Sequence, residues 1–277
     1  MNMSPGEWLL TWRNHRHIGD LQSRLSYRKE RLFIAACCRQ VLHLVPEEPC
    51  RLAVEAAEAF ADGQISDRQL RKARRAANTV SQVLWDESQA AYVSHPLSSN
   101  PKTTAANLVV HARRQAAEAC KGAVMTRHQL ARMKGKEATW AACHAAEIEK
   151  FYEALVAAPA AACATPPHDR WEEEAAETAQ DQARLAATRP QVEMLFDMLV
   201  DAPRRHRVDP GWLVWNDGTV RKMATAIYAD RDWSTLPMLA DALEDAGCAD
   251  QELLKHLRGP GPHVRGCWAL DLLLGLE

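Results

Sequence analysis

Residues 66–84 read SDRQLRKARRAANTVSQVL, and this stretch decides the fold class. Ser66 followed by Gln69 is the pattern of a capping box, in which each side chain binds the other's backbone at the start of a helix. Apolar side chains then recur at the spacing of one helix face, in a stripe with heptad character: Leu70, Ala73, Ala77, Val80 and Leu84. The stretch predicts an amphipathic helix that packs against neighbouring helices.

Two further helices are predicted before this one. Residues 26–44 and 49–61 are predicted helices, which end at Pro46 and Gly63 respectively. Later helices are predicted to start at Thr104, at Asp217 or Thr219, at Asp250 and at about Val264. Aromatic residues make up only 6% of the chain, whereas alanine, the strongest helix former, is abundant. Short connections between such helices favour an antiparallel bundle. We therefore predict an all-α fold: an antiparallel helical bundle followed by a smaller C-terminal helical module.

The predicted boundary between these parts is a proline-rich segment. Residues 158–168 carry prolines and no large apolar side chain, which is typical of a linker. The predicted organisation is an N-terminal alanine-rich bundle over 1–157, the linker, and a C-terminal helical module over 169–277. The formal net charge is −2, with a basic excess before the linker and an acidic excess after it. That division fits two parts that dock on each other.

The chain contains no long apolar run and no secretory pattern at its beginning, so we predict no membrane association and a cytoplasmic location. The reducing cytoplasm keeps cysteines as free thiols, which we expect to be buried in helices at Cys37, Cys38, Cys120 and Cys143. The motifs GxGxxG, GxSxG and HExxH and the Walker lysine are absent, so we predict no cofactor and no catalytic residue. Cys37 with His43 and Asp20 is not a credible nucleophile because Cys37 lies on an apolar stripe.

The tail holds the densest group of reactive side chains, in the stretch LRGPGPHVRGCW at residues 257–268. If the last helix starts at His263, its first turn lies beside Arg258 and Arg265 and could hold an anion or a carboxylate of a partner. The structural alternative is that the glycines and prolines only close a hairpin, with the arginines paired to Asp241, Glu244 or Asp245. Exposed Trp and Arg anchor interfaces. The predicted contacts with an unknown protein partner are Trp215, Arg258, His263, Arg265 and Trp268.

Two further functions stay open. Two thiols and two imidazoles suit tetrahedral zinc, although their spacing matches no compact zinc motif, and a zinc-dependent or thiol-dependent enzyme could use them. These residues are Cys248, His256, His263 and Cys267. The first half of the 66–84 helix could instead lie along nucleic-acid phosphates, form a solvated face, or dock on the acidic helix expected over residues 172–181. Its basic side chains are Arg68, Arg71, Lys72, Arg74 and Arg75.

Three stretches carry a resemblance to a known family. They are RLFIAACCRQVLHL at Arg31–Leu44, AVEAAEAFADG at Ala53–Gly63 and LADALEDAGCADQELLKHLRGPGPHVRGCWALDLLLG at Leu239–Gly275. In these stretches the chain resembles a large paralogous family of planctomycete bacterial proteins that has no established activity. The resemblance implies the helical fold and its two end modules, and it implies no functional residue. The leading functional hypothesis is thus a non-enzymatic protein-interaction or regulatory module.

Overall fold

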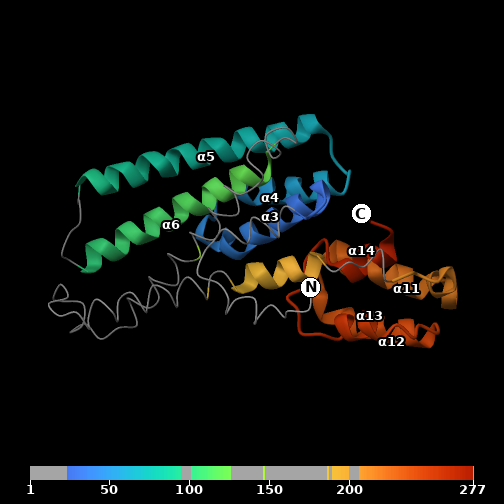
Figure 1. Cartoon of the computed structure of the whole chain (residues 1–277). Coiled ribbons are helices and arrows are strands. Elements are labelled where there is room, and N and C mark those ends of the chain that lie inside the picture. The colour runs from blue at the N-terminus through green and yellow to red at the C-terminus, as the bar shows by residue number, and fades with distance from the viewer. Residues whose placement is uncertain are drawn as a thin grey trace, which may run out of the picture. The chain divides into compact units, whose positions relative to one another are not determined.

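A computed structural model of the chain describes residues 24–94, 101–125, 146, 186, 189–199 and 206–276. All regular elements within these ranges are helices, and none of these residues is in a strand (Figure 1). The predicted all-α class is confirmed. No helix in the described ranges has both the length and the apolar character needed to span a membrane.

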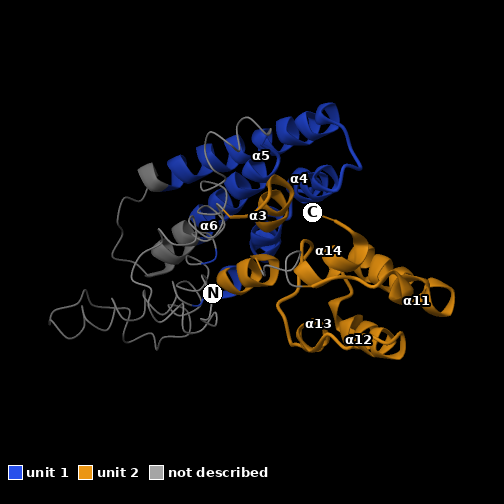
Figure 2. Cartoon of the chain, turned by 45° about the vertical axis from the view of Figure 1, so that its right-hand side comes forward, with its two compact units in different colours: residues 1–13, 34–191 blue, residues 14–33, 192–277 orange. Residues whose placement is uncertain are grey.

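The chain divides into two compact units (Figure 2). Unit 1 comprises Met1–Arg13 and Ile34–Gln191, and unit 2 comprises Asn14–Phe33 and Val192–Glu277. Helix α3 (Tyr27–Val41) contributes residues to both units. The predicted linker 158–168 lies outside the described residues, as does the acidic segment that was expected to face the basic helix.

Unit 1 is a helical bundle. Besides the end of α3 it contains η1 (Leu42–Leu44), α4 (Glu48–Ala61), α5 (Asp67–Ser94) and α6 (Pro101–Ala123). Helices α4, α5 and α6 pack against one another in pairs, and α5 and α6 run alongside each other in opposite directions (Figure 1). The antiparallel arrangement follows from the short connections, as predicted.

The residues of α5 fold as the 66–84 stretch predicts. The Ser66 N–H donates to Gln69 Oε1 at 2.8 Å, and the Gln69 N–H donates to Ser66 Oγ at 3.4 Å, which completes the capping box. Leu70, Ala77 and Leu84 of the stripe are buried, so the stripe faces its own bundle. One prediction was wrong in its bounds. Helix α6 starts at Pro101 rather than Thr104, because a proline fits the first turn of a helix.

Unit 2 is assembled from shorter helices. They are the first turns of α3, residues 192–199 of a helix over 189–199, α11 (Pro210–Asp230), η2 (Trp233–Thr235), α12 (Leu236–Asp245), α13 (Gln251–Leu257) and α14 (Trp268–Leu274). Asp250 caps α13 as predicted, because its Oδ1 accepts from the Glu252 and Leu253 N–H groups at 3.1 Å. Leucines of α12, α13 and α14 form the centre of its core.

Helix α11 contains a sharp kink. Asn216, Asp217 and Gly218 all have positive φ, so the regular part of α11 starts after Gly218. The Thr219 hydroxyl donates to the Asn216 carbonyl at 2.7 Å at this point. The sequence predicted a helix start at Asp217 or Thr219, and the short helical turn before the kink was not predicted.

Helix α14 also starts later than predicted, at Trp268 instead of Val264. Gly266 has a φ of +92°, which ends any helix that would begin before it. His263 therefore lies in the connection before α14, and the predicted anion site at the start of a helix beginning at His263 does not form. Cys37, Cys38 and Cys120 are buried free thiols as predicted, and Cys143 lies outside the described residues. The other described cysteines, Cys50, Cys248 and Cys267, are also buried free thiols.

Candidate metal centre

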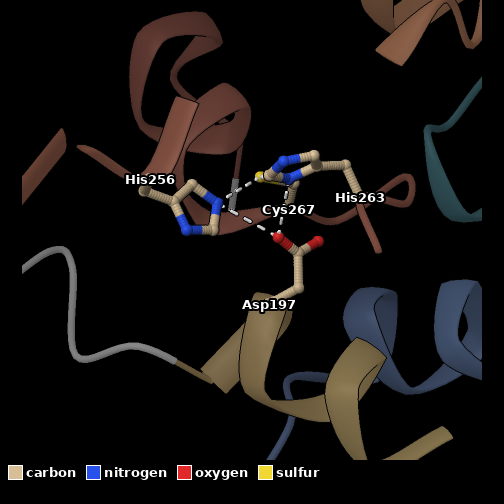
Figure 3. Close-up of side chains that lie close together, drawn as sticks. All are labelled: Asp197, His256, His263 and Cys267. Atoms are coloured by element: carbon tan, nitrogen blue, oxygen red, sulfur yellow. Dashed lines mark hydrogen bonds and ion pairs between the residues drawn. The ribbon is translucent and has the colours of Figure 1, made fainter. Parts of the chain in front are cut away.

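Four side chains of unit 2 converge on one point (Figure 3). Asp197 comes from the helix over residues 189–199, His256 from α13, His263 from the connection after α13, and Cys267 from the residue before α14. We call these four residues the candidate metal centre. Their nearest donor atoms all lie within 4.8 Å of one another.

Local backbone structure brings the last three donors together. Gly261 has a φ of +84°, and a Cβ added there would lie 2.8 Å from the His263 nitrogen. Only glycine therefore allows the chain to turn so closely in front of His263. The second turn, at Gly266, reverses the chain again before Cys267. His256, at the end of α13, and Cys267, at the start of α14, then meet across these two turns.

The distances between donor atoms resemble the edges of a tetrahedron. Asp197 Oδ1 lies 3.1 Å from His256 Nε2 and 3.2 Å from His263 Nδ1. Cys267 Sγ lies 3.2 Å from His256 Nε2 and 4.0 Å from His263 Nδ1. At zinc–nitrogen and zinc–sulfur bond lengths of about 2.0 and 2.3 Å, neighbouring ligand atoms of a tetrahedron lie roughly 3.3–3.6 Å apart. The four observed values run from 3.1 to 4.0 Å, and all donor pairs lie within 4.8 Å, so the wider-spaced donors would have to move closer together to surround a cation of this size.

Backbone groups orient two of the four donors. His263 Nε2 lies 3.2 Å from the Gly259 carbonyl oxygen, and a proton on Nε2 that is donated there leaves the Nδ1 lone pair facing the centre. The Val264 N–H donates to Asp197 Oδ2 at 3.3 Å, which leaves Oδ1 to face the centre. Hydrogen bonds of this kind, made by the far atom of a ligand, are the usual outer shell of a protein metal site.

Burial and charge act on the protons of the centre. Burial would raise the pKa of Asp197, but its hydrogen bonds to His256 and His263 outweigh burial and lower the pKa. Burial would lower the pKa of His263, but Asp197 outweighs it and raises the pKa. Burial, together with the charge of Asp197, raises the pKa of the Cys267 thiol well above its ordinary value. Asp197 is therefore held as a carboxylate beside an imidazole whose positive charge it favours, and the Cys267 thiol is held in its neutral form.

The centre is closed on most sides. Asp197, His263 and Cys267 are buried, while the His256 side chain is 21% exposed. Trp268 packs on the His256 ring with centroids 4.8 Å apart and on the His206 ring with centroids 4.9 Å apart. Four protein donors complete a tetrahedral shell, which is the pattern of structural sites. Catalytic zinc sites keep one position for water or substrate.

The structure brings together three of the four residues that the sequence proposed for zinc, namely His256, His263 and Cys267. Cys248 does not belong to the group. It is buried in the apolar core after α12, where its N–H donates to the Leu243 carbonyl at 2.9 Å. Asp197 was missed because it lies far upstream. The available signal was a carboxylate placed directly between the apolar residues Phe196 and Met198 of one helix.

The proposed protein-contact residues have partners within unit 2. His263 and Trp268 are buried. Arg258 is exposed and pairs with Asp241 at 2.7 Å and with Glu244, as the structural alternative predicted. Arg265 donates to the Tyr228 and Ala229 carbonyls at 3.2 Å, and Trp215 is half-buried against the core. These five residues do not share one exposed face.

The residues proposed for nucleic-acid binding lie along the first half of α5. Arg68, Arg71, Lys72 and Arg75 are exposed, and Arg74 is half-buried. Arg71 pairs with Asp67 at 3.2 Å on the same helix. Cys37 is fully buried, which agrees with its structural interpretation, and Asp20 lies outside the described residues.

Comparisons with family models, with curated proteins and with solved structures gave no match to this chain. The resemblance to the planctomycete family therefore stays a prediction, and the functional argument rests on the geometry of the centre.

Proposed function

We propose that unit 2 binds one Zn²⁺ through Asp197, His256, His263 and Cys267, and that the chain is a non-enzymatic interaction or regulatory module stabilised by this metal. One observation carries the proposal. Four donor atoms from three separate segments converge within 4.8 Å in a largely buried place. A reducing cytoplasm, which the sequence predicts, would keep Cys267 available as a thiolate ligand.

The chemistry of the donors selects the metal. Mg²⁺ and Ca²⁺ prefer shells made of oxygen atoms, whereas a thiolate with two imidazoles suits zinc and its neighbours in the periodic table. Zinc also accepts a tetrahedral shell without an electronic penalty. A thiol proton and a histidine proton leave for the solvent when the metal binds, so affinity for zinc should rise with pH.

The alternative is that the four side chains form only a metal-free polar cluster. In that state a buried carboxylate interacts with two imidazoles beside a thiol whose burial opposes ionisation. Buried ionic groups are costly unless their geometry is fully satisfied, and replacing them with apolar residues is often neutral or stabilising. In the metal-free cluster, hydrogen bonds between Asp197 Oδ1 and the two imidazoles would hold His263 Nδ1 and Asp197 Oδ1 in the same orientation. Metal analysis therefore has to separate the two states.

The closed shell supports the non-enzymatic part of the proposal. A substrate or water needs a free vertex on a catalytic metal, and four protein donors occupy all four vertices of a tetrahedron. We therefore place the zinc in a structural role and rank the zinc-enzyme hypothesis below it.

Metal analysis of the purified full-length chain tests zinc binding directly. We expect one zinc per chain, and we expect Co²⁺ exchanged into the site to show thiolate-to-cobalt charge transfer and the intense visible bands of tetrahedral cobalt. Cys267→Ser should abolish the charge-transfer band, and Asp197→Asn should weaken metal retention. Cys248→Ser is the matched control, since it removes a buried thiol of the same unit outside the centre. Absence of stoichiometric zinc, together with failure to take up Co²⁺, would reject the proposal.

A second measurement separates structural from catalytic zinc. Azide added to the cobalt-substituted protein should leave the visible spectrum unchanged if the shell is closed. A spectral change that saturates with azide would show an exchangeable position and would favour the enzyme hypothesis.

Nucleic-acid binding is the second candidate function, favoured by the exposure of Arg68, Lys72 and Arg75 along one face of α5. Phosphate contacts make affinity fall steeply with salt. The test is fluorescence anisotropy with labelled single-stranded RNA and duplex DNA at two salt concentrations, comparing the parent with a triple Arg68→Glu, Lys72→Glu, Arg75→Glu variant. Salt-insensitive or unmeasurable binding by the parent would remove this candidate.

A further inference from the structure

The first two turns of α3 lie against the chain on both sides of the candidate metal centre. Lys29 Nζ donates to the Met198 carbonyl at 2.9 Å, and Met198 follows the proposed ligand Asp197. A Cβ added to Gly266, which precedes the proposed ligand Cys267, would lie 3.3 Å from both Leu32 Cδ1 and Met198 Cε. The same short segment thus touches the chain neighbours of two ligands that come from different helices.

Ion pairs also connect the first turns of α3 to Asp271 of α14. Arg28 Nη1 lies 2.9 Å from Asp271 Oδ2, and Lys29 Nζ lies 3.5 Å from the same oxygen. Asp271 is buried, and its N–H donates to the Cys267 carbonyl at 2.9 Å, so it stands one helical turn after the ligand. Arg28 Nη2 also donates to the Tyr228 hydroxyl at 2.6 Å.

Two sets of interactions, the proposed metal bonds and the contacts of α3, therefore connect the same helices of unit 2. The metal would join the 189–199 helix to α13 and α14 through Asp197, and α3 joins the same helix to α14 through Lys29 and Leu32. Each set of interactions holds the 189–199 helix and the start of α14 in the positions that the other set requires. Two binding events that stabilise one arrangement are coupled, and the coupling is reciprocal.

We infer that metal binding regulates the packing of the α3 start against the rest of unit 2, so that Tyr27–Phe33 is held firmly only in the zinc-loaded protein. Lys29 is a positioning residue in this inference, because it acts on the metal through the carbonyl beside Asp197. The inference rests on the proposed zinc binding and adds the regulation of that site. The partner of the switch is a segment of the same chain.

Reciprocity makes the inference testable from the metal side. Competition with a chromophoric chelator measures the zinc affinity of the full-length chain. We expect Lys29→Met to weaken that affinity about tenfold, within the usual range of coupling between sites. Lys29→Arg should restore most of it, because a guanidinium can still donate to the Met198 carbonyl. Lys222→Met is the matched control, since Lys222 is an exposed lysine of unit 2 that pairs with Asp217.

Hydrogen exchange tests the same inference from the α3 side without any variant. Removing zinc from the parent protein should raise the exchange rate of a peptide covering Tyr27–Phe33 by more than that of Leu236–Asp245 in α12. If the chain binds zinc, but Lys29→Met binds it as tightly as the parent does or the two peptides respond equally, the coupling is rejected while the zinc proposal stands. If neither zinc nor Co²⁺ binds the parent, the proposed function fails first and the inference falls with it.

Discussion

Unit 1 and unit 2 are both helical, but different interactions hold them together. Unit 1 contains α5 with 28 residues and α6 with 23, and a long amphipathic helix buries enough apolar surface to fix its position. In unit 2, α13 and α14 have seven residues each. Helices of two turns are marginal by themselves, and small cores commonly need a metal or another cross-link. The candidate metal centre of unit 2 therefore lies beside its two shortest α-helices, α13 and α14, where apolar packing alone stabilises least.

Metal removal should separate the two units most clearly. Chelation should lower the free energy of unfolding of unit 2 by about 4 kcal/mol if free zinc stands a thousandfold above its Kd, and Asp197→Asn, which weakens the site, should lower it by less. Unit 1 has no part in the centre and should keep its stability. Hydrogen exchange along the full chain reports both units at once. Equal loss of protection in α5 and in α12 would contradict the contrast between them.

The apolar stripe of α5 should show the opposite dependence. Leu84→Ala leaves a cavity at a position that is 2% exposed, and such cavities cost about 2–5 kcal/mol. The loss should be the same with and without zinc, because Leu84 packs inside unit 1. Urea denaturation followed by circular dichroism, with and without a chelator, measures it. Val83→Ala is the control, since Val83 is 51% exposed on the same helix. A zinc-dependent loss at Leu84 would mean that the metal also supports unit 1.

Unit 1 contains a partly buried ion pair between Arg39 and Glu58, which involves no metal. Arg39 holds the buried Glu58 with two hydrogen bonds of 2.7 and 2.8 Å, and Glu58 raises the pKa of the guanidinium. Arg39→Met leaves this carboxylate without that partner, which should cost about 1–3 kcal/mol after allowance for the partial exposure of Arg39. Arg51→Met breaks only exposed pairs with Glu48 and Glu55 and should change stability by less than about 1 kcal/mol. Similar losses for both variants in urea denaturation would show that burial of Glu58 does not matter.

The smallest expected change in stability is the one caused by removing the N-cap of α13, Asp250. Asp250→Ala removes the acceptor for the Glu252 and Leu253 N–H groups and should cost about 1 kcal/mol. Burial would raise the pKa of Asp250, but the hydrogen bond with His206 and those with the α13 N–H groups outweigh it and lower the pKa.

This depressed pKa fixes the sign of the pH dependence. The carboxylate stabilises the fold above its ordinary pKa of 3.8, and the stabilisation is lost as pH falls through the lowered folded-state pKa. Asp250→Asn keeps a capping oxygen and removes the titration, so denaturation curves of the two proteins should converge in acid. An unchanged difference between pH 7 and pH 3 would rule out the contribution of the Asp250 charge.

Local sequence patterns accounted for most helix positions, because caps, proline and glycine act within a few residues of where they stand. Ser66 with Gln69, Asp250, and the heptad residues Leu70, Ala77 and Leu84 lie where the sequence predicted them. The errors occurred where a glycine turn or a proline shifted a helix start, at Pro101 and at Trp268. Both errors were a few residues long, yet the second moved His263 and Cys267 out of a helix and into the candidate metal centre.

Sequence patterns were enough to predict that the chain is helical, where most helices begin and end, and that His256, His263 and Cys267 stand close along the chain. Three-dimensional packing was needed to find that Asp197 completes the group, that Cys248 packs in the apolar core instead, and that Trp268 and His263 are buried. The physical reason is that a helix depends on neighbours within a turn or two. A metal centre depends instead on where packing brings segments that are far apart in the chain.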